Sequence, residues 1–246
     1  MEQLVLITGA SRGIGAATAL LAAEQGYAVG INYRSDAEAA ADVARAVEAA
    51  GAEALLLPGD IASEAGIGAI FEAVDASGLA LTGLVNNAGV VGRVDAFTAY
   101  DSARLRRTFE VNVLGAFLCA REAVRRMLAQ HAGGAIVNVS SAAARLGSPG
   151  EFIDYAASKG AIDTLTLGLA KELGDKGIRV NAVRPGLIDT TIHASAGAPD
   201  RLERLAPGVP MQRAGSVAEV ARAIMWLLSD DASYVTGSLL DVAGGR

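Results

Sequence analysis

The sequence predicts an α/β fold, in which a doubly wound parallel sheet of about seven strands carries helices on both faces. Short, continuously apolar runs such as LVLI and AIVNV are typical of strands that are buried on both faces. Longer segments with apolar residues at helical spacing separate these runs, and this alternation predicts parallel strands joined by helices. No linker, repeat or low-complexity tract divides the 246 residues, so we expect a single domain spanning 1–246.

The expected elements follow one another in a regular order. The strands are predicted at Leu4–Ile7, Ala28–Tyr33, Ala54–Leu57, Gly83–Asn86, Ala135–Ser140, Arg179–Val183 and Ser238–Asp241. Two apolar helical stripes consist of Val217, Val220, Ala221, Ile224 and Leu228, and of Ile162, Leu165, Leu169 and Leu173. The segment 189–215 is instead rich in turn-forming glycine and proline, and we expect a lid over a substrate site there rather than an ordinary surface loop.

The bulk composition excludes several classes of protein. A formal net charge of −6 disfavours nucleic-acid binding, which needs a surplus of lysine and arginine. No apolar run is long enough to span a bilayer, and the first residues lack the basic start of a signal peptide, so no membrane association is expected. The single cysteine, Cys119, lies in an apolar run, where we expect a buried thiol and a reducing, cytoplasmic setting.

A glycine-rich turn joins the first expected strand to the first helix. Gly9, Gly13 and Gly15 lie where the chain must turn tightly and bring bare backbone close to a ligand. The helix that follows offers free N–H groups and a partial positive charge, and both suit a pyrophosphate. We therefore expect a dinucleotide site at this turn rather than a purely structural turn.

Four motifs along the chain form a larger pattern. They are T-G-x-x-x-G-I-G at Thr8–Gly15, N-N-A-G at Asn86–Gly89, Y-x-x-x-K at Tyr155–Lys159 and P-G-x-x-x-T at Pro185–Thr190. Their order and spacing resemble the short-chain dehydrogenase/reductase family over essentially the whole chain. The resemblance implies a Rossmann-type fold and NAD(P)-dependent hydride transfer between a carbonyl and an alcohol of a small-molecule substrate.

Tyr155 and Lys159 are the candidate acid/base unit. On a helix that starts near Asp154 they lie one turn apart, and the ammonium is expected to lower the phenol pKa from its usual value of about 10. The resemblance implies that Tyr155 is the general acid/base and that Lys159 also holds the nicotinamide ribose hydroxyls. It further implies that Asn112 supports a water-linked proton relay to the lysine; the alternative is a local helix kink with no catalytic part.

A serine at the end of the fifth expected strand would bind the substrate oxygen, and two adjacent serines compete for this role. Alignment with the family places the active serine at Ser141, and Ser140 is the alternative. Neighbouring strand residues point to opposite sides, so only one of them should face the cleft. The loop from Ser141 to Tyr155 is one residue longer than the commonest family spacing. The extra length lies in Arg145–Glu151, where we expect the loop to border the substrate.

The end of the second expected strand indicates which dinucleotide is preferred. NAD-dependent sites usually place Asp or Glu there to bind the ribose 2′-hydroxyl, whereas this chain has Tyr33 followed by Arg34. Arg34 and Arg12 could pair with a 2′-phosphate, which predicts NADP(H) as the preferred cofactor and NAD(H) as the alternative. Asp36, close by, is expected to cap the next helix.

By resemblance, the cofactor-binding residues extend along the chain. They are Gly9, Ser11, Arg12, Gly13, Ile14, Gly15, Tyr33, Arg34, Asp60, Ile61, Asn87, Ala88, Gly89, Tyr155, Lys159, Pro185, Gly186, Ile188 and Thr190. Asp60 would meet the adenine, and Ile188 and Thr190 would bind the carboxamide. Pro185 is also expected to end the sixth strand, because proline cannot donate a hydrogen bond to the sheet.

The sequence leaves the substrate open. The overall pattern resembles 3-oxoacyl-(acyl carrier protein) reductases, whereas RLGSPGEFIDYAASKGAID more closely resembles glucose 1-dehydrogenase-like members. Acyl carrier protein is acidic, so a reductase acting on it should carry a basic patch near the cleft, for which Arg125 and Arg126 are the candidates. The alternative from a different class is a non-catalytic NAD(P)-binding regulatory protein of the same fold.

Two further expectations concern metals and assembly. His131 and His193 lack the spacing of metal ligands, so no metal site is expected. Apolar residues lie outside the main stripes of two helices, at Leu167 on one and in VLGAFL (113–118) on the other. Family members commonly pair these helices across a dimer, so the resemblance implies a homotetramer. Extra burial within one subunit is the alternative.

Overall fold

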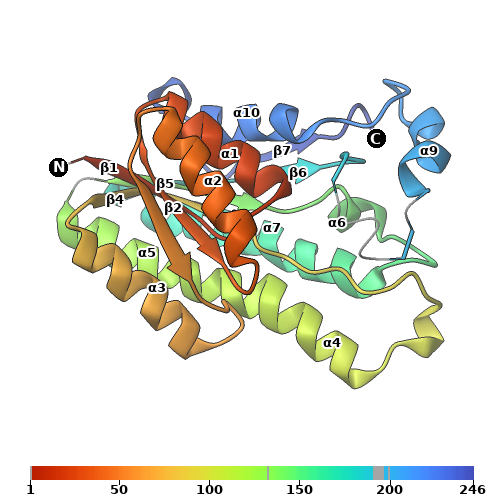
Figure 1. Cartoon of the computed structure of the whole chain (residues 1–246). Coiled ribbons are helices and arrows are strands. Elements are labelled where there is room, and N and C mark those ends of the chain that lie inside the picture. The colour runs from red at the N-terminus through yellow and green to blue at the C-terminus, as the bar shows by residue number, and fades with distance from the viewer. Residues whose placement is uncertain (1, 132, 191–196, 199) are drawn as a thin grey trace.

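The computed structural model describes residues 2–131, 133–190, 197–198 and 200–246. Within them, seven parallel strands form one sheet in the order β3-β2-β1-β4-β5-β6-β7 (Figure 1). The strands are β1 (Gln3–Ile7), β2 (Ala28–Tyr33), β3 (Ala54–Pro58), β4 (Ala80–Asn86), β5 (Gly134–Val139), β6 (Ile178–Pro185) and β7 (Leu239–Val242). All seven predicted strands are confirmed, with ends that differ by one to three residues where they differ at all.

Helices cover both faces of this sheet (Figure 1). One layer consists of α1 (Gly13–Glu24), α2 (Ala37–Ala49) and α10 (Val217–Leu228). The opposite layer consists of α3 (Glu64–Ser77), α4 (Ser102–Phe109), α5 (Ala116–Gln130) and α7 (Ile153–Leu173). Two short helices, α6 (Ala143–Leu146) and α9 (Arg201–Leu205), lie beyond the carboxyl end of the sheet. The predicted doubly wound architecture is thus confirmed.

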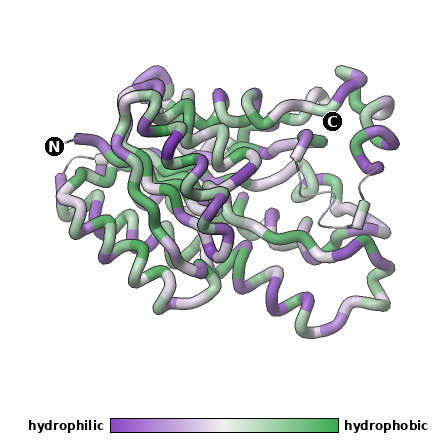
Figure 2. The backbone as a smooth tube through the Cα atoms, viewed as in Figure 1, coloured by the Kyte–Doolittle hydropathy of each residue, from purple (hydrophilic) through white to green (hydrophobic). Residues whose placement is uncertain are grey.

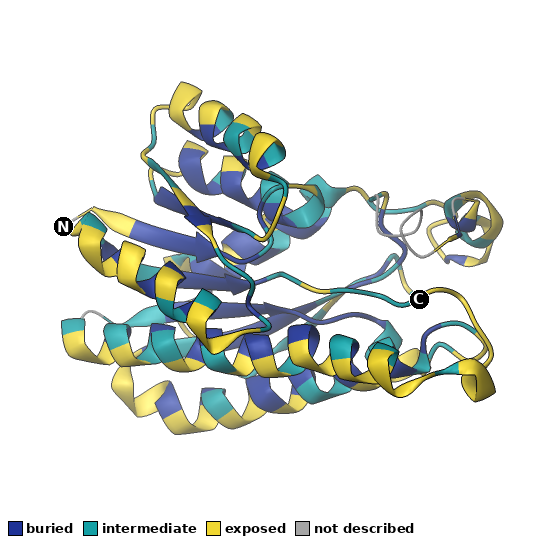
Figure 3. Cartoon of the chain, turned by 60° about the horizontal axis from the view of Figure 1, so that its bottom comes forward, coloured by how far each residue is buried: buried dark blue, intermediate teal, exposed yellow. Residues whose placement is uncertain are grey.

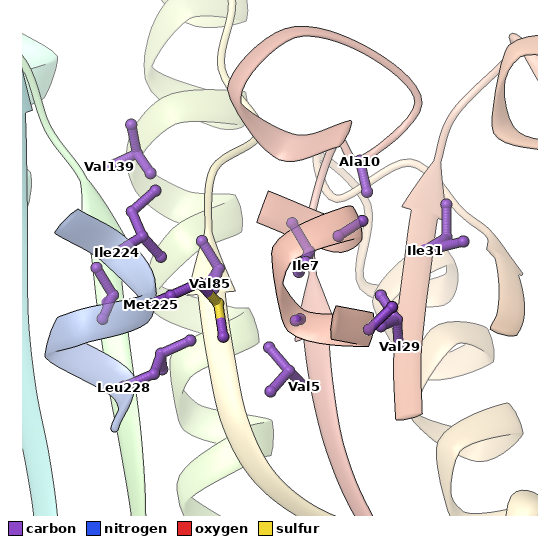
Figure 4. Close-up of a cluster of buried hydrophobic side chains, with 14 of the residues drawn as sticks. Val5, Ile7, Ala10, Val29, Ile31, Val85, Val139, Ile224, Met225 and Leu228 are labelled. Carbon is purple, nitrogen blue, oxygen red and sulfur yellow. The ribbon is translucent and has the colours of Figure 1, made fainter. Parts of the chain in front are cut away.

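Alternate residues of the central strand face opposite layers. Val5 and Ile7 of β1 pack with α1 and α10, whereas Leu4 and Leu6 pack with α3 and α5. Figure 4 shows the first of these clusters, with Ile224 of α10 lying over the sheet. The strands are green in the hydropathy colouring of Figure 2 and are the most buried elements in Figure 3. Burial on both faces explains why the strands read as continuous apolar runs.

Local signals in the sequence set several element ends. The Asp36 carboxylate accepts a hydrogen bond from the Ala39 N–H at 3.2 Å, which confirms the predicted cap of α2. Helix α10 starts with a capping box between Ser216 and Glu219. Strand β6 ends at Pro185, as predicted. These ends matter for function because the loops that begin there form the site.

The predicted lid segment, 189–215, is described in part. It contains α9 and a 3-10 turn at Ala206–Gly208, whereas residues 191–196 and 199, and with them His193, lie outside the described residues. The lid therefore stays a prediction. Among the described residues, no helix is both long enough and apolar enough to cross a membrane.

Candidate active site

The carboxyl ends of the strands open into one large pocket of about 900 Å³. Its walls come from the segments after β1 to β6, which meet there because the strands are parallel and the chain reverses direction across the sheet between β1 and β4. The predicted site residues that line it are Gly9, Ser11, Arg12, Gly13, Ile14, Tyr33, Arg34, Asp60, Ile61, Asn87, Ala88, Gly89, Ser141, Tyr155, Lys159, Pro185, Gly186, Ile188 and Thr190. Two others, Gly15 and Asn112, are buried and lie outside this lining.

The turn after β1 has a shape that requires glycine. Gly9 and Gly13 have φ angles of 63° and 59°, in the left-handed region. A Cβ atom at Gly9 would lie 2.9 Å from Ala88 Cα, and one at Gly15 would lie 2.6 Å from the Gly9 carbonyl oxygen. At Gly13, by contrast, nothing lies within 4 Å of the Cβ position. The turn therefore packs tightly on the protein side and presents bare backbone to the pocket.

Helix α1 begins in this turn with an uncapped N-terminus. Arg12, at the N-cap, makes no side-chain hydrogen bond to the helix, and the first turn contains no acidic residue. The first N–H groups of a helix have no partner within it, and the helix dipole adds a partial positive charge. Because Gly13 and Ile14 line the pocket, this end of the helix fits a pyrophosphate group.

Two buried polar side chains that the sequence reasoning overlooked hold the turn in place. Thr8 Oγ1 accepts hydrogen bonds from the N–H groups of Asn87 and Ala88, both at 3.0 Å. Asn32 Oδ1 accepts from the Gly9 N–H at 3.2 Å, while its amide donates to two backbone carbonyls at the end of β3. Asn32 is the polar residue within the apolar run AVGINY, and this exception to the pattern could have indicated a buried polar side chain near the site.

Tyr33 and Arg34 lie at the end of β2 and line the pocket together with Arg12. Arg12 and Arg34 are both exposed, and no described carboxylate forms an ion pair with either guanidinium group. Asp36 is engaged at the cap of α2. Asp60 accepts from a backbone N–H two residues ahead at 3.0 Å and lies 3.6 Å from an arginine of α4.

Ser141, Tyr155 and Lys159 come together in one wall of the pocket. Ser141 follows β5, and the other two residues occupy adjacent turns of α7, which begins one residue before the predicted start. The Ser141 hydroxyl accepts a hydrogen bond from the Ala143 N–H at 3.1 Å and lies close enough to the Tyr155 phenol to lower the pKa of that phenol. Lys159 Nζ lies 5.6 Å from the centroid of the Tyr155 ring and donates to the Val139 carbonyl oxygen at 2.7 Å.

The predicted lowering of the Tyr155 pKa is wrong for this arrangement. Burial raises the pKa of Tyr155, and the hydrogen bond with Ser141 offsets only part of the effect. Burial also lowers the pKa of Lys159 to about 8, against an opposing effect of the Asp163 carboxylate. The Lys159 ammonium donates its hydrogen bond to a carbonyl oxygen, and the loss of water around the phenol is the largest influence on the Tyr155 pKa.

Ser140 turns away from the phenol. Its Oγ donates to the Lys159 carbonyl oxygen at 3.1 Å, and the residue is buried. Both serines border the pocket, but Ser141 is the one that acts on the Tyr155 phenol, whose pKa it lowers. The geometry therefore favours Ser141 over Ser140 as the partner of the substrate oxygen.

Asn112 lies in a π-helical segment between α4 and α5, at Glu110–Gly115. Its Oδ1 accepts from the Val90 N–H at 2.8 Å, and its Nδ2 donates to the Val90 carbonyl at 2.9 Å and to a serine hydroxyl of α7 at 3.1 Å. The distorted helix that was the alternative for Asn112 is therefore present. Asn112 is nevertheless a neighbour of the lysine, because a Cβ at Gly89 would lie 3.4 Å from Asn112 Oδ1 and 3.5 Å from Lys159 Nζ.

The segment after β6 forms another wall. The Gly186 N–H, next to Pro185, donates to a carbonyl at the end of β7 at 3.0 Å. Ile188 then forms an isolated parallel bridge with Gly215, which joins the two ends of the predicted lid segment. Ile188 and Thr190 line the pocket beyond this point.

The described part of the predicted lid segment contacts the segment that follows the Arg145–Glu151 loop and the loop itself. Arg201 of α9 forms an ion pair with Glu151 and lies 5.1 Å from the centroid of the Phe152 ring. All three residues line the pocket, with apolar neighbours at Leu146 and Leu205. Leu146 and Glu151 belong to the Arg145–Glu151 loop that was expected to border the substrate, and Arg201 and Leu205 belong to the predicted lid segment. The contact between the two segments was not predicted, because it joins positions about fifty residues apart in the chain.

A buried ion pair fixes the start of α7. The Asp154 carboxylate accepts from Arg104 Nε and Nη2, both at 2.9 Å, and from Thr108 Oγ1 at 3.1 Å. Burial alone would raise the pKa of Asp154, but Arg104, the Tyr155 N–H and Thr108 together hold that pKa below its usual value. Arg104 also lies 3.7 Å over the Tyr100 ring. The pair thus ties α4 to the residue next to Tyr155.

Several other predicted features lie away from the pocket. Arg125 and Arg126 pair with Glu122 and, in the case of Arg126, with Asp75, so they form no basic patch beside the cleft. His131 ends α5 on the surface. Cys119 is fully buried, as predicted. In the described ranges no group of His, Cys, Asp or Glu is arranged to hold a metal ion.

Comparison with known proteins agrees with the fold and the motifs. A family model described as enoyl-(acyl carrier protein) reductase matches residues 9–246. The uncharacterized oxidoreductase YgfF of Escherichia coli (strain K12) is 54% identical over 245 residues, covering 99% of each chain. The crystal structure of acetoin dehydrogenase YohF from Salmonella typhimurium matches with a TM-score of 0.89 at 36% identity, over 100% of this chain and 97% of that one. A short-chain type dehydrogenase/reductase from Mycobacterium marinum gives a TM-score of 0.92 at 33% identity, over 99% and 94% of the two chains. The chain therefore belongs to the short-chain dehydrogenase/reductase family and is an oxidoreductase of that family.

Proposed function

We propose that the chain is an NADP(H)-dependent oxidoreductase that interconverts a carbonyl and an alcohol, with Tyr155 as the general acid/base. One observation carries the proposal. A single pocket joins the uncapped N-terminus of α1 to the cluster of Ser141, Tyr155 and Lys159. An anion site and a proton-transfer site in one cavity are what a dinucleotide-dependent redox reaction needs.

Each residue of the cluster has a role in this proposal. NADP(H), when bound, supplies or accepts the hydride. Ser141 binds the substrate oxygen and orients it toward Tyr155, which gives the proton in reduction and takes it in oxidation. Lys159 holds ribose hydroxyls and favours the phenolate by its charge. The raised pKa of Tyr155 keeps the phenol protonated at neutral pH, which suits the direction of carbonyl reduction.

Substitution of the cluster tests this mechanism. We expect Tyr155→Phe to lower kcat by roughly 10²–10⁴-fold while NADPH still binds, because general acid catalysis contributes about that factor. The exposed Tyr234, at 103% relative exposure, provides the matched control Tyr234→Phe. Ser141→Ala should lose far more turnover than Ser140→Ala, and equal losses would contradict the assignment of Ser141. NADPH binding without turnover of any ketone, aldehyde, sugar or acyl thioester would favour the regulatory alternative.

The preference for NADP(H) rests on Arg12 and Arg34. Both line the pocket without a described carboxylate partner, and Tyr33 stands where NAD-dependent sites usually carry an acid. We expect Arg34→Gln to reduce kcat/KM for NADPH by roughly 10–100-fold with little change for NADH, since a hydrogen bond to a charged group contributes about 1.5–3 kcal/mol. Arg45→Gln on α2, outside the pocket, is the control. A wild-type chain that uses NADH as efficiently as NADPH would overturn the preference.

A ketone is favoured over a 3-oxoacyl group on acyl carrier protein. Arg125 and Arg126, the candidates for docking an acidic carrier, are engaged in ion pairs away from the pocket. The substrate end of the pocket has apolar walls, including Leu146 and Phe152. A solved relative, 36% identical, is described as an acetoin dehydrogenase. Reduction rates for a small ketone, a cyclic ketone, a sugar and a 3-oxoacyl thioester would rank the classes, and the fastest rate with the thioester would refute this choice.

We also propose that the chain assembles into a homotetramer. Leu114, Phe117 and Leu167 are 51%, 43% and 39% exposed, so the alternative of burying them within one subunit is wrong. Their exposure on neighbouring segments leaves an apolar surface suited to pairing with a second copy. Light scattering at micromolar concentration should give four times the chain mass. A monomer under those conditions would remove the proposal.

A further inference from the structure

A buried carboxylate on the catalytic helix has no part in the chemistry proposed above. Asp163 lies on α7 one helical turn after Lys159, and its side chain is 10% exposed. Its Oδ2 accepts from Arg184 Nη2 at 2.8 Å and from Arg184 Nε at 3.1 Å. Its Oδ1 is buried with no hydrogen-bond partner among the described residues. An unpartnered buried oxygen is costly, and a protein that retains one calls for an explanation.

Arg184 connects Asp163 to a line of alternating charges. Arg184 belongs to β6, and its Nη1 lies 3.9 Å from Asp241 Oδ1 on β7. Asp241 in turn pairs with Arg145 of α6 at 3.1 Å. Exposure rises along this line, from 10% for the Asp163 side chain to 14% for Arg184 and 41% for Asp241. Asp163 is thus the most buried end of the network, on the side of the catalytic lysine.

The surroundings of Lys159 contain few charges. Its Nζ donates to the Val139 carbonyl oxygen, and the nearby groups of Gly89 and Asn112 are uncharged. Tyr155 and Asp163 lie one turn before and one turn after it on the same helix, and Asp163 acts on it through charge rather than through a direct ion pair. The pKa of Lys159 is lowered to about 8, the net result of burial, which lowers it, and of the Asp163 charge, which raises it. The only described carboxylate acting on the lysine therefore opposes the loss of its charge.

We propose that Asp163, held by Arg184, is a positioning residue that keeps Lys159 protonated during the reaction. A charged Lys159 is what the proposed function requires, both to bind ribose hydroxyls and to favour the phenolate, so the inference rests on that function. Arg184 binds only Oδ2, so it fixes the carboxylate while leaving Oδ1 unpartnered. Asp163 acts through Lys159 and does not line the pocket itself.

The pH dependence of turnover tests this role. Asp163→Asn removes the charge that favours the ammonium, so the Lys159 pKa falls and the alkaline limb of kcat/KM moves to lower pH by roughly one unit. Asp163→Glu retains the charge and should keep the wild-type profile. The control is Asp241→Asn, which breaks the outer pairs of the network without contact to Lys159. A profile of Asp163→Asn that superimposes on that of the wild type would overturn the proposal.

A second measurement does not depend on turnover. The chain has only three lysines, Lys159, Lys171 and Lys176, so ¹³C-lysine labelling yields three sets of side-chain signals for an NMR titration. The ¹³Cε signal of Lys159, identified by its loss in Lys159→Arg, should titrate at lower pH in Asp163→Asn than in the wild type. This result would support the role of Asp163 even if no substrate were turned over. An absence of turnover would count against the proposed function only.

A third variant covers the case in which Asp163→Asn fails to fold. Asp163→Asn leaves the buried Arg184 without a charged partner, and an uncompensated buried charge is strongly destabilising. The double variant Asp163→Leu/Arg184→Met replaces both charges with apolar side chains of similar volume, and such a replacement is often neutral for stability. Because the Arg184 charge repels the Lys159 ammonium, its removal offsets part of the effect, so we expect the Lys159 signal to show an acid shift that is smaller than in Asp163→Asn. An unchanged titration of Lys159 in this folded variant would overturn the proposal.

Discussion

Loss of Arg104 should destabilise the chain at the start of α7. The Asp154 side chain has 0% exposure and receives two hydrogen bonds from Arg104 and one from Thr108. Arg104→Met leaves that carboxylate buried with only Thr108 and the Tyr155 N–H as donors. Breaking a buried pair typically costs 3–5 kcal/mol, and the remaining donors place the expected loss near the lower end, at about 3 kcal/mol.

Thermal unfolding followed by circular dichroism measures this loss at a fixed protein concentration. For a chain of this size, about 3 kcal/mol corresponds to a decrease in Tm of roughly 6–12 °C at neutral pH. The exposed Arg106 on the same helix provides the control Arg106→Met, which should change the free energy of unfolding by less than about 0.5 kcal/mol. Arg104→Met/Asp154→Asn should recover part of the loss, because no unpaired charge then remains.

The contribution of the Arg104–Asp154 pair to stability depends on pH. The Asp154 pKa in the folded chain lies below its usual value, so the pair stabilises the fold above pH about 4 and loses this contribution as pH falls through the folded pKa. The difference in Tm between wild type and Arg104→Met should therefore narrow in acid. A decrease of less than about 3 °C at neutral pH, or a double variant less stable than Arg104→Met, would refute the reasoning.

Three further predictions follow from other parts of the fold. Gly9→Ala should weaken NADPH binding and cost about 1–3 kcal/mol in unfolding, since φ is 63° and the new Cβ would lie 2.9 Å from Ala88 Cα; an unchanged Kd would contradict this. The Cys119 thiol, whose pKa burial raises to about 12, should react with a maleimide at least about 100-fold more slowly in the folded than in the unfolded chain. Ser216→Ala should cost about 1 kcal/mol in denaturant unfolding because it removes the capping box with Glu219, and no measurable loss would show that the cap is redundant.

Much of the fold could be predicted because its signals are local. The strands are short apolar runs, and longer helical segments, two of them with an apolar stripe at helical spacing, separate these runs, so the order of elements can be read along the chain. Pro185 ends β6 and Asp36 caps α2, as predicted, because both side chains act on the adjacent backbone. The glycine turn was recognisable for the same reason, since its spacing reflects backbone shape.

The site was predictable only in part, because contact between distant segments has no local signal. Arg201 meets Glu151, and Arg104 meets Asp154, across about fifty residues of chain. The spacing of Tyr155 and Lys159 indicated a pair, but not that the lysine would donate to a strand carbonyl. The expected lowering of the tyrosine pKa failed on this point, since desolvation depends on what surrounds a group in three dimensions.

The sequence by itself determined the parallel sheet, the glycine turn at the start of α1 and the residue types of the acid/base cluster. It could do so because hydrophobic period, backbone conformation and one-turn spacing are properties of neighbouring residues. Only the tertiary structure decided that Ser141 and not Ser140 acts on the phenol, and that Asp163 is buried on the helix that carries Lys159. These outcomes depend on how β5, β6 and α7 pack, and burial and charge acting together at that junction set the protonation of the site.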